Sequence, residues 1–165
     1  GRDVFGADLS RSAADHAAKR AAAAGKADIC RFAVASVFEL PLADGCADAV
    51  LCMFSPCAER EYTRVLKPGG VLLVGFDNGI NYLFDDDETK ITNTLPYNPL
   101  KDEALYKKSL ELDYGVQFSH TLDEEIGGQL RAGFMLTDIY EDTNGGGFLH
   151  EHGVPCFVAT RCVKK

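Results

Sequence analysis

Two apolar runs decide the fold: ADAVLCMF at residues 47–54 and VLLVGF at residues 71–76. Each is almost continuously apolar, which is typical of strands buried on both faces of a parallel sheet. Residues 56–66 between them carry several charged residues and predict a helix, which the turn KPGG at residues 67–70 would end. A strand, a helix and a second strand in this order predict a parallel unit whose sheet is covered by helices.

The sequence before these runs has a similar pattern. VFGAD at residues 4–8 is a short apolar run that ends in an acid, and it predicts a strand. Residues 10–24 are rich in alanine, the strongest helix former, with Ser10 as a suitable N-cap and Gly25 as the stop. Residues 29–35 predict the next strand. Alternating strands and helices with short connections indicate a doubly wound α/β sheet.

The second half of the chain departs from this pattern after Gly79. Residues 81–112 are polar and dotted with aromatic side chains, and they are interpreted as an insertion at about residues 81–114. Residues 116–120 predict a short strand, and Thr121 with Glu124 forms a capping box that opens a helix through about residue 131. Residues 134–140 and 156–163 predict two strands joined by a glycine-rich loop at 144–147. The predicted sheet is therefore mostly parallel, with an antiparallel C-terminal edge strand.

Composition limits the class of protein. The 165 residues fit one domain, and a hydrophobic fraction of 46% is ordinary for a folded protein. No apolar stretch approaches the roughly 20 residues that span a bilayer, so we expect no membrane span and a cytoplasmic protein. A net charge of −8 argues against a nucleic-acid surface and favours a small or protein substrate. The six cysteines show no metal-ligand spacing and are interpreted as mostly buried thiols.

The ends of the predicted strands carry the candidate site residues, because ligands of open α/β sheets bind outside the carboxyl ends of the strands. An acid at the position of Asp8 can accept hydrogen bonds from both hydroxyls of a ribose, although it can equally stabilise the start of the following helix. Ser36 and Val37 follow the next strand and can meet an adenine edge. Met53 and Phe54 can pack against a flat base or a thioether, and core packing is their alternative.

Four ordered motifs resemble a known family. They are VFGADLS at residues 4–10, LPLADG at 40–45, ADAVL at 47–51 and RVLKPGG at 64–70. Each is weak alone, but in this order and at this spacing over the first half of the chain they look like the motifs of class I S-adenosylmethionine-dependent methyltransferases. The resemblance implies a Rossmann-like fold with S-adenosylmethionine as the cofactor.

The resemblance also implies a role for each candidate residue. Asp8 would hold the ribose hydroxyls, with Leu9 beside the adenine. Ser36 stands where the family commonly has an Asp that binds the adenine amino group, and Val37 would supply a backbone amide. Met53 and Phe54 would line the methionine end of the cofactor and begin the acceptor pocket. No catalytic base is assigned, while Tyr82, Cys57 and His120 are possible acceptor-pocket residues with structural roles as their alternatives.

The main departure from the family lies at the start. Family members carry a strand and a glycine-rich loop of the form E/D-x-G-x-G directly before the segment equivalent to residues 1–8, and this chain lacks it. We therefore expect a domain that is partial at its N-terminus, with unpaired strand edges where the missing strand would lie. We also expect these 165 residues alone to bind S-adenosylmethionine weakly or not at all.

Several alternatives remain open from the sequence. The chain can be a non-catalytic Rossmann-like binding module, or a nicotinamide-dependent oxidoreductase, against which the KPGG turn argues. The segment FSPC at residues 54–57 is similar to bacterial ribosomal RNA guanine methyltransferases, so an RNA acceptor is less favoured but open. Two features suggest a metal only weakly: the pair His150 and His152 lacks a third ligand, and the acidic run at 85–88 is interpreted as a solvated surface. We expect no metal site.

Overall fold

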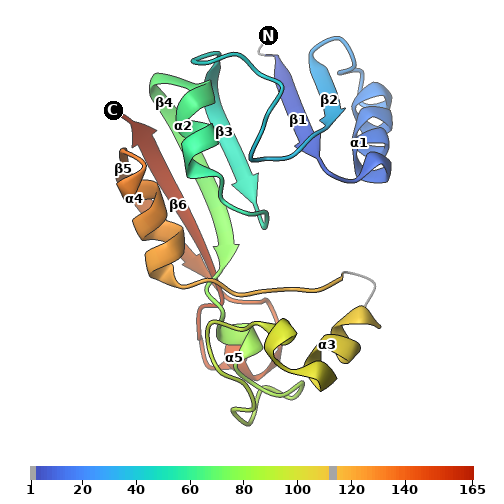
Figure 1. The fold of residues 1–165 in the computed structure, drawn as a ribbon, viewed down its shortest axis with the longest axis vertical. Helices are drawn as coiled ribbons and strands as arrows, with labels where there is room; N and C mark the ends of the chain where they lie inside the picture. The colour runs from blue at the N-terminus through green and yellow to red at the C-terminus, as the bar shows by residue number, and fades with distance from the viewer. Residues whose placement is uncertain (1–2, 112–114) are drawn as a thin grey trace.

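The computed structural model describes residues 3–111 and 115–165. Its first half follows the predicted order, with β1 at Val4–Asp8, α1 at Arg11–Ala23, β2 at Cys30–Val34, β3 at Ala47–Met53, α2 at Glu59–Val65 and β4 at Leu66–Asp77 (Figure 1). The Ser10 hydroxyl caps α1 by accepting a hydrogen bond from the N–H of Ala13. Gly25 follows the helix with a φ of 66°. The α/β class is confirmed, and local capping residues define the ends of α1.

The strands form two sheets. β1 pairs in parallel with β2, whereas the second sheet has the order β3-β4-β6-β5, with β5 at Phe134–Asp142 and β6 at Phe157–Lys164. β3 and β4 are parallel, and β6 is antiparallel to both β4 and β5. The predicted antiparallel strand is therefore present, and it lies one position inside the edge. Among the described strands, β1 pairs only with β2 and β3 only with β4, so β1 and β3 each have one unpaired edge.

Helices cover one face of the four-stranded sheet. α2 and α4, at Gly128–Arg131, lie in front of it in Figure 1. The core beneath them includes Tyr62, Leu72, Val74, Phe76 and Val158. On β3, by contrast, Leu51 is 68% exposed and Met53 is 50% exposed. The prediction that residues 47–54 are buried on both faces is wrong, because in the described part of the chain β3 has a single partner strand and the helices cover a single face of its sheet.

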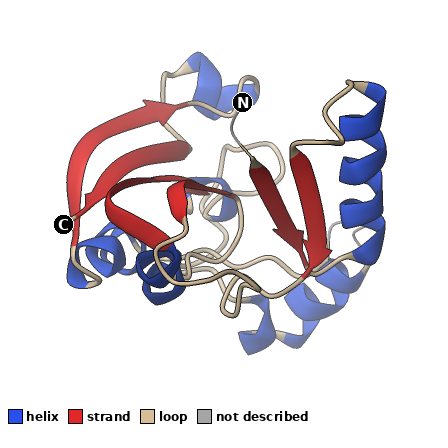
Figure 2. Cartoon of the chain, turned by 90° about the horizontal axis from the view of Figure 1, so that it is seen from above, coloured by secondary structure: helices blue, strands red, loops and turns tan. Residues whose placement is uncertain are grey.

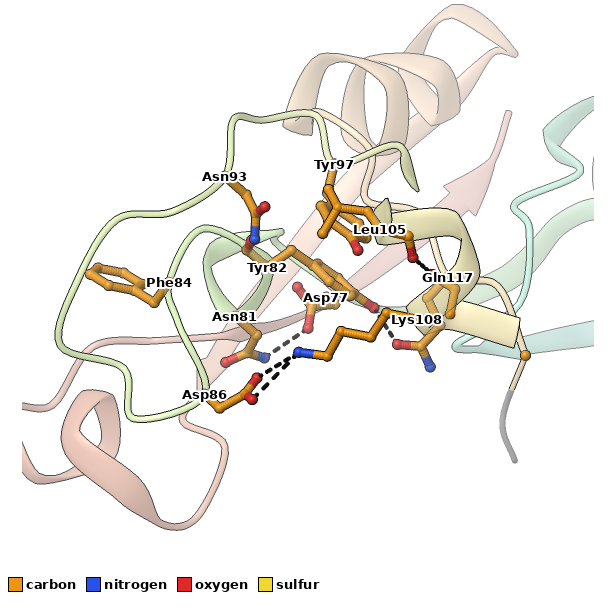
Figure 3. Close-up of a pocket in the computed structure, with 12 residues that line it drawn as sticks. Asp77, Asn81, Tyr82, Phe84, Asp86, Asn93, Tyr97, Leu105, Lys108 and Gln117 are labelled. Atoms are coloured by element: carbon orange, nitrogen blue, oxygen red, sulfur yellow. Dashed lines mark hydrogen bonds and ion pairs between the residues drawn. The ribbon is translucent and has the colours of Figure 1, made fainter. Parts of the chain in front are cut away.

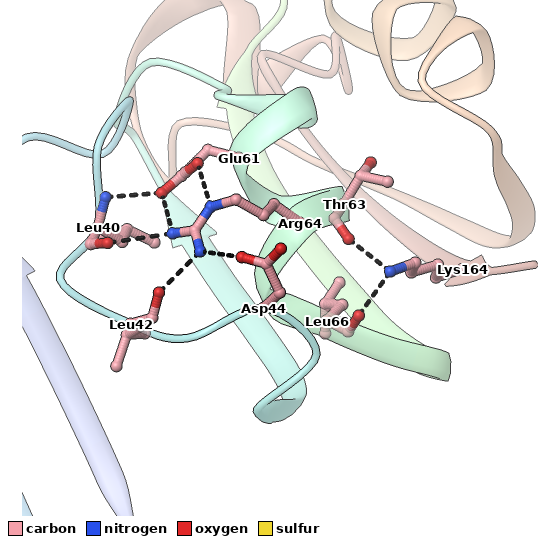
Figure 4. A network of polar contacts seen from close by, with 8 residues as sticks. All are labelled: Leu40, Leu42, Asp44, Glu61, Thr63, Arg64, Leu66 and Lys164. Atoms are coloured by element: carbon pink, nitrogen blue, oxygen red, sulfur yellow. Dashed lines mark hydrogen bonds and ion pairs between the residues drawn. The ribbon is translucent and has the colours of Figure 1, made fainter.

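A network around α2 fixes the loop that connects the two sheets (Figure 4). The guanidinium of Arg64 donates to both carboxylate oxygens of Glu61, at 2.6 and 2.9 Å. It also donates to the carbonyls of Leu40 and Leu42 and to the carboxylate of Asp44. Glu61 in turn accepts a hydrogen bond from the N–H of Leu40 at 2.7 Å. Lys164 donates to the carbonyls of Thr63 and Leu66, so the C-terminal end of α2 is also held by β6.

Two boundaries differ from the sequence expectations. α2 begins at Glu59, so the preceding residues are not helical. Residues 67–70 belong to β4, where the ladder passes from Leu66 opposite Ala47 to Val71 opposite Ala49. The expected turn is therefore a bulge in β4, and Gly69 adopts a φ of 75° within it.

The second half confirms the helix and corrects the strand predicted before it. Thr121 and Glu124 form the expected capping box, with the N–H of each donating to the side chain of the other. The helix then passes through a π-helical turn at Asp123–Gly127 (η3) into α4. Residues 116–120 do not form a strand. The N–H of Ser119 donates to the carbonyl of Tyr97, and this single backbone hydrogen bond does not make a ladder. The link between β5 and β6 contains a short helix, α5 at Gly147–Glu151.

The remaining short elements form a lobe below the four-stranded sheet. It contains the 3₁₀ turns η1 at Ile80–Tyr82 and η2 at Pro99–Lys101, and α3 at Glu103–Leu110 (Figure 1). The last residues of the predicted insertion, 112–114, lie outside the described residues. Figure 2 shows the β1–β2 pair, with α1 beside it, set apart from the larger curved sheet. Within the described parts of the chain, no helix is long and apolar enough to cross a membrane.

Replacement of Gln129 by alanine tests the buried contact between α4 and β6. Gln129 is fully buried; its amide donates to the carbonyl of Glu125, and its Oε1 accepts from Thr160 Oγ1 and Cys162 Sγ. Gln129→Ala would leave a cavity and two buried donors without a partner, so we expect a loss of about 3 kcal/mol in the free energy of unfolding. Urea denaturation measures it, with the exposed Gln117→Ala as the control. Equal stabilities of the two variants would contradict this account.

Acid titration tests the Glu61–Arg64 pair. Hydrogen bonds from Arg64 lower the pKa of Glu61 to about 2, with the Leu40 N–H assisting and burial opposing. A carboxylate with a lowered pKa stabilises the fold above its unfolded pKa, near 4.5, and this stabilisation is lost as the pH falls toward 2. We expect Glu61→Gln to be less stable than the parent at pH 7, with the gap narrowing as the pH falls from 5 toward 2. The exposed Glu39→Gln serves as the control, and a gap independent of pH would argue against the pair.

Candidate functional site

Asp8 and Leu9 lie at the carboxyl end of β1. The Asp8 carboxylate is exposed, and its Oδ1 accepts a hydrogen bond from the N–H of Ser10 at 2.7 Å. This bond orients the exposed carboxylate. Leu9 is 75% exposed and presents an apolar surface beside the acid. The strand end therefore offers an oriented anion next to an uncovered apolar side chain.

Ser36 and Val37 lie beside Asp8, at the end of the neighbouring strand. The N–H of Ala35 donates to the carbonyl of Asp8 at 3.1 Å, which continues the parallel ladder past β2. The Ser36 hydroxyl accepts a hydrogen bond from the N–H of Phe38, so it is engaged in a local turn. Val37 packs against the core of the four-stranded sheet. The structure thus brings Asp8 and Ser36 together, and Val37 connects them to the second sheet.

Met53 and Phe54 occupy the carboxyl end of β3, on the other sheet. Met53 pairs with Gly75 of β4, and its terminal methyl group lies 2.5 Å from where a Cβ at Gly75 would be. A side chain at residue 75 would displace the Met53 methyl group, so Met53 can keep this position only when residue 75 is glycine. Phe54 has a φ of 50°, which is unusual for a bulky residue, and its N–H donates to the carbonyl of Gly75. Its ring packs edge-on against Phe157, with ring centres 5.4 Å apart.

A cavity of about 550 Å³ opens beyond the end of β4, between this strand and the lobe formed by residues 79–111 and 115–117 (Figure 3). Its lining includes Asp77, Asn81, Tyr82, Asn93, Tyr97 and Lys108. The sequence analysis named Tyr82, but it missed Asn81, Asn93, Tyr97 and Lys108. These residues lie in the segment predicted as an insertion, where no periodic pattern indicates which side chains face inward.

Asp77 is the carboxylate that belongs to both β4 and the cavity. Its two oxygens accept hydrogen bonds from the N–H of Gly79 and from the side-chain amide of Asn81, at 2.5 and 2.8 Å. Burial raises the pKa of Asp77 above its ordinary value, although both hydrogen bonds act to lower it. Because burial outweighs the two hydrogen bonds, a further hydrogen-bond donor or a positive charge in the cavity would stabilise the ionised form of Asp77.

Two other residues considered from the sequence lie outside the cavity lining. His120 is exposed and faces Glu124, with 3.7 Å between His120 Nδ1 and a carboxylate oxygen. Cys57 packs against the core, and burial raises its pKa, so the thiol stays protonated and poorly nucleophilic.

The acidic run at residues 85–88 holds the lobe together. Asp86 pairs with Lys108, and the two oxygens of Glu88 accept hydrogen bonds from the Asn144 amide and from the N–H of Leu149. The interpretation of the run as a solvated surface is therefore wrong for Glu88. Among the residues that the structure describes, no group of acidic, histidine and cysteine side chains could hold a metal ion.

Comparisons with known proteins find methyltransferases. Residues 1–74 match the family described as "Methyltransferase domain". The chain is 37% identical over 112 residues to the uncharacterized methyltransferase YbaJ of Bacillus subtilis, and the match covers 64% of this chain and 43% of that protein. The chain thus spans less than half of the curated relative that it matches.

Solved structures share the fold at low identity. An S-adenosylmethionine-dependent methyltransferase from Mesorhizobium loti superposes with a TM-score of 0.74 at 18% identity, over 99% of this chain and 81% of that one. Geranyl diphosphate C-methyltransferase from Streptomyces coelicolor gives a TM-score of 0.66 at 16% identity, over 100% of this chain and 64% of that one. The matched segment and the shared fold confirm the resemblance to class I S-adenosylmethionine-dependent methyltransferases.

Replacement of Asp77 by asparagine tests the environment of the cavity. A carboxyl group whose folded pKa is raised binds its proton more tightly in the folded state, so the parent chain loses stability as the pH rises from 3.8 through the folded pKa. Asp77→Asn keeps an acceptor for the Gly79 N–H and has no proton to lose. We therefore expect its stability relative to the parent to increase between pH 3.5 and pH 7 in urea denaturation. A relative stability that stays constant, or falls, would contradict a raised pKa.

Proposed function

We propose that the chain forms the greater part of a methyltransferase domain that uses S-adenosylmethionine and methylates a small-molecule acceptor. One observation carries the proposal: the carboxyl ends of the parallel strands present Asp8 and Leu9 on one sheet and Met53 and Phe54 on the other, in a fold shared with methyltransferases. Open α/β sheets bind ligands at this edge.

The residues at the strand ends fit the cofactor. Asp8 has an exposed carboxylate that the N–H of Ser10 orients, and a carboxylate can accept hydrogen bonds from both hydroxyls of a ribose. Leu9 and Phe54, at 75% and 64% exposed, offer apolar surface to a base and to the methyl-bearing end. The thioether of Met53 lies beside Gly75, where its soft sulfur can contact a sulfonium group. When bound, the sulfonium supplies an activated methyl group that moves by in-line displacement.

The task of the protein is then to position the acceptor and exclude water. Phe54 and Met53 cover the end of β3 with apolar groups, and Phe54 contacts Phe157, the register partner of Asp77. The cavity at Asp77 thus adjoins the end of β3 through two aromatic rings. An acceptor in this cavity would approach the reacting end of the cofactor from the side of the insertion, which we assign to acceptor recognition.

A small-molecule acceptor is supported by charge and by the neighbouring structures. The net charge of −8 disfavours a nucleic-acid surface. One neighbour was solved with geranyl diphosphate and S-adenosylhomocysteine, a small substrate and the demethylated cofactor. The comparisons favour neither a non-catalytic binding module nor a ribosomal RNA methyltransferase.

Calorimetric titration with S-adenosylhomocysteine tests the cofactor site. In a longer protein that carries a strand and a glycine-rich loop of the form E/D-x-G-x-G before residue 1, we expect Asp8→Ala to weaken binding by at least about tenfold, because the charge-assisted hydrogen bonds to the ribose are lost. Asp15→Ala, on the exposed side of α1, is the matched control and should bind like the parent. The 165-residue chain should bind weakly or not at all, since β1 and β3 each keep an unpaired edge next to the site.

Two results would count against the proposal. The first is the absence of binding by the longer protein, and the second is an Asp8→Ala variant that binds as tightly as the parent. Micromolar binding by the 165 residues alone would leave the methyltransferase assignment intact but would refute the dependence on a further strand.

A further inference from the structure

The lining of the cavity beyond β4 contains one unsatisfied hydrogen-bond acceptor. Asn81 Oδ1 is buried and has no hydrogen-bond partner within the described residues. The amide of the same side chain already donates to Asp77 Oδ2, and the amide of Asn93 donates to the carbonyl of Tyr82. Each of these amides thus uses one N–H group, while the Asn81 Oδ1 acceptor is unsatisfied. A buried acceptor without a partner costs free energy, which a ligand with an N–H or O–H group would recover.

The walls of the cavity are aromatic. Tyr82 and Tyr97 stack with their ring centres 5.1 Å apart and their planes 10° from parallel. Tyr97 is held by Ser119, whose hydroxyl accepts the N–H of Tyr97 and whose N–H donates to the Tyr97 carbonyl. Phe84 and Leu105 add apolar surface. A flat ring can therefore extend the tyrosine stack without displacing the backbone that holds it.

The charges of the cavity do not cancel. Lys108 pairs at 3.4 Å with Asp86, and both side chains are largely exposed at the rim. Asp77 lies deeper and is hydrogen-bonded only by uncharged groups, the Gly79 N–H and the Asn81 amide. The floor therefore keeps one negative charge without a cationic partner among the described residues, which favours a positively charged ligand over an anion.

We propose that this cavity binds a planar, ring-bearing amine, whose ammonium or N–H groups bond to Asn81 Oδ1 and Asp77 while its ring lies against Tyr82 and Tyr97. The volume of the cavity, about 550 Å³, is in the range of small-molecule binding sites. The assignment of the cavity as the acceptor site rests on the proposed function. It follows from the position of the cavity, which adjoins the end of β3 through Phe54 and Phe157. As a binding site for amines it stands on its own residues.

Three indole probes of matched shape test the charge preference: tryptamine, its carboxylate counterpart indole-3-propionate, and the neutral tryptophol. Binding to the 165-residue chain is followed by calorimetry and by amide shifts in ¹H–¹⁵N spectra. We expect tryptamine to bind at least about tenfold more tightly than indole-3-propionate, with tryptophol between them. The largest shifts should fall on the side-chain amides of Asn81 and Asn93.

Two variants and a control separate the roles of the residues. Asp77→Asn should bring tryptamine and indole-3-propionate within about threefold of each other. Glu103→Gln, a matched change outside the cavity on α3, should leave the preference unchanged. Asn81→Ala should weaken tryptamine and tryptophol together, and it keeps the proposal testable if Asp77→Asn does not fold.

The results distinguish this inference from the proposed function. Equal binding of tryptamine and indole-3-propionate, a preference that survives in Asp77→Asn, or no tryptamine binding at millimolar concentration would each overturn the amine site. If S-adenosylhomocysteine still binds in those cases, the methyltransferase assignment stands. If tryptamine binds as expected but the longer protein does not bind S-adenosylhomocysteine, the amine site stands and the methyltransferase assignment falls.

Discussion

The hydrogen-bonded pair of Glu61 and Arg64 fixes how the two sheets are connected. No strand ladder joins the sheets within the described residues, so their relation depends on the segment between β2 and β3. Arg64 donates to backbone carbonyls of that segment, and Glu61 accepts a hydrogen bond from the N–H of Leu40 in the same segment. An ion pair that also satisfies backbone groups is a stronger constraint than an exposed pair, because it orders a loop as well as two side chains. Val37 and Leu40 pack on the core and add an apolar component.

Local signals predicted most of the secondary structure. Ser10, Gly25 and the pair of Thr121 and Glu124 each act within one turn of chain, so their effect is visible in the sequence. The burial of β3 and the strand at residues 116–120 were not predicted correctly. Apolar composition indicates what a strand could bury, but burial depends on which partners are present, and residues 116–120 have no neighbouring strand with which to pair.

The candidate site shows the same difference between local signals and long-range contacts. The fold positions Asp8, Ser36, Met53 and Phe54 because parallel strands end at a common edge, so their placement follows from the strand assignment. The cavity depends on long-range contacts between loops: Ser119 holds Tyr97, and Glu88 holds the loop before α5 through the amide of Asn144. Neither contact has a sequence signature, since a serine or a glutamate in a polar segment usually faces solvent.

Phe54 links the two halves of the site through its backbone. A bulky residue with a φ of 50° costs about 1–3 kcal/mol, and such strain persists only where the surroundings enforce it. Here the N–H of Phe54 is held by the Gly75 carbonyl and its ring by Phe157. Continuing β3 in an extended conformation would turn the ring away from Phe157 and separate the end of β3 from Asp77. The strained residue therefore keeps the end of β3 and the cavity on adjoining surfaces, which is the arrangement that the proposed methyl transfer between two ligands requires.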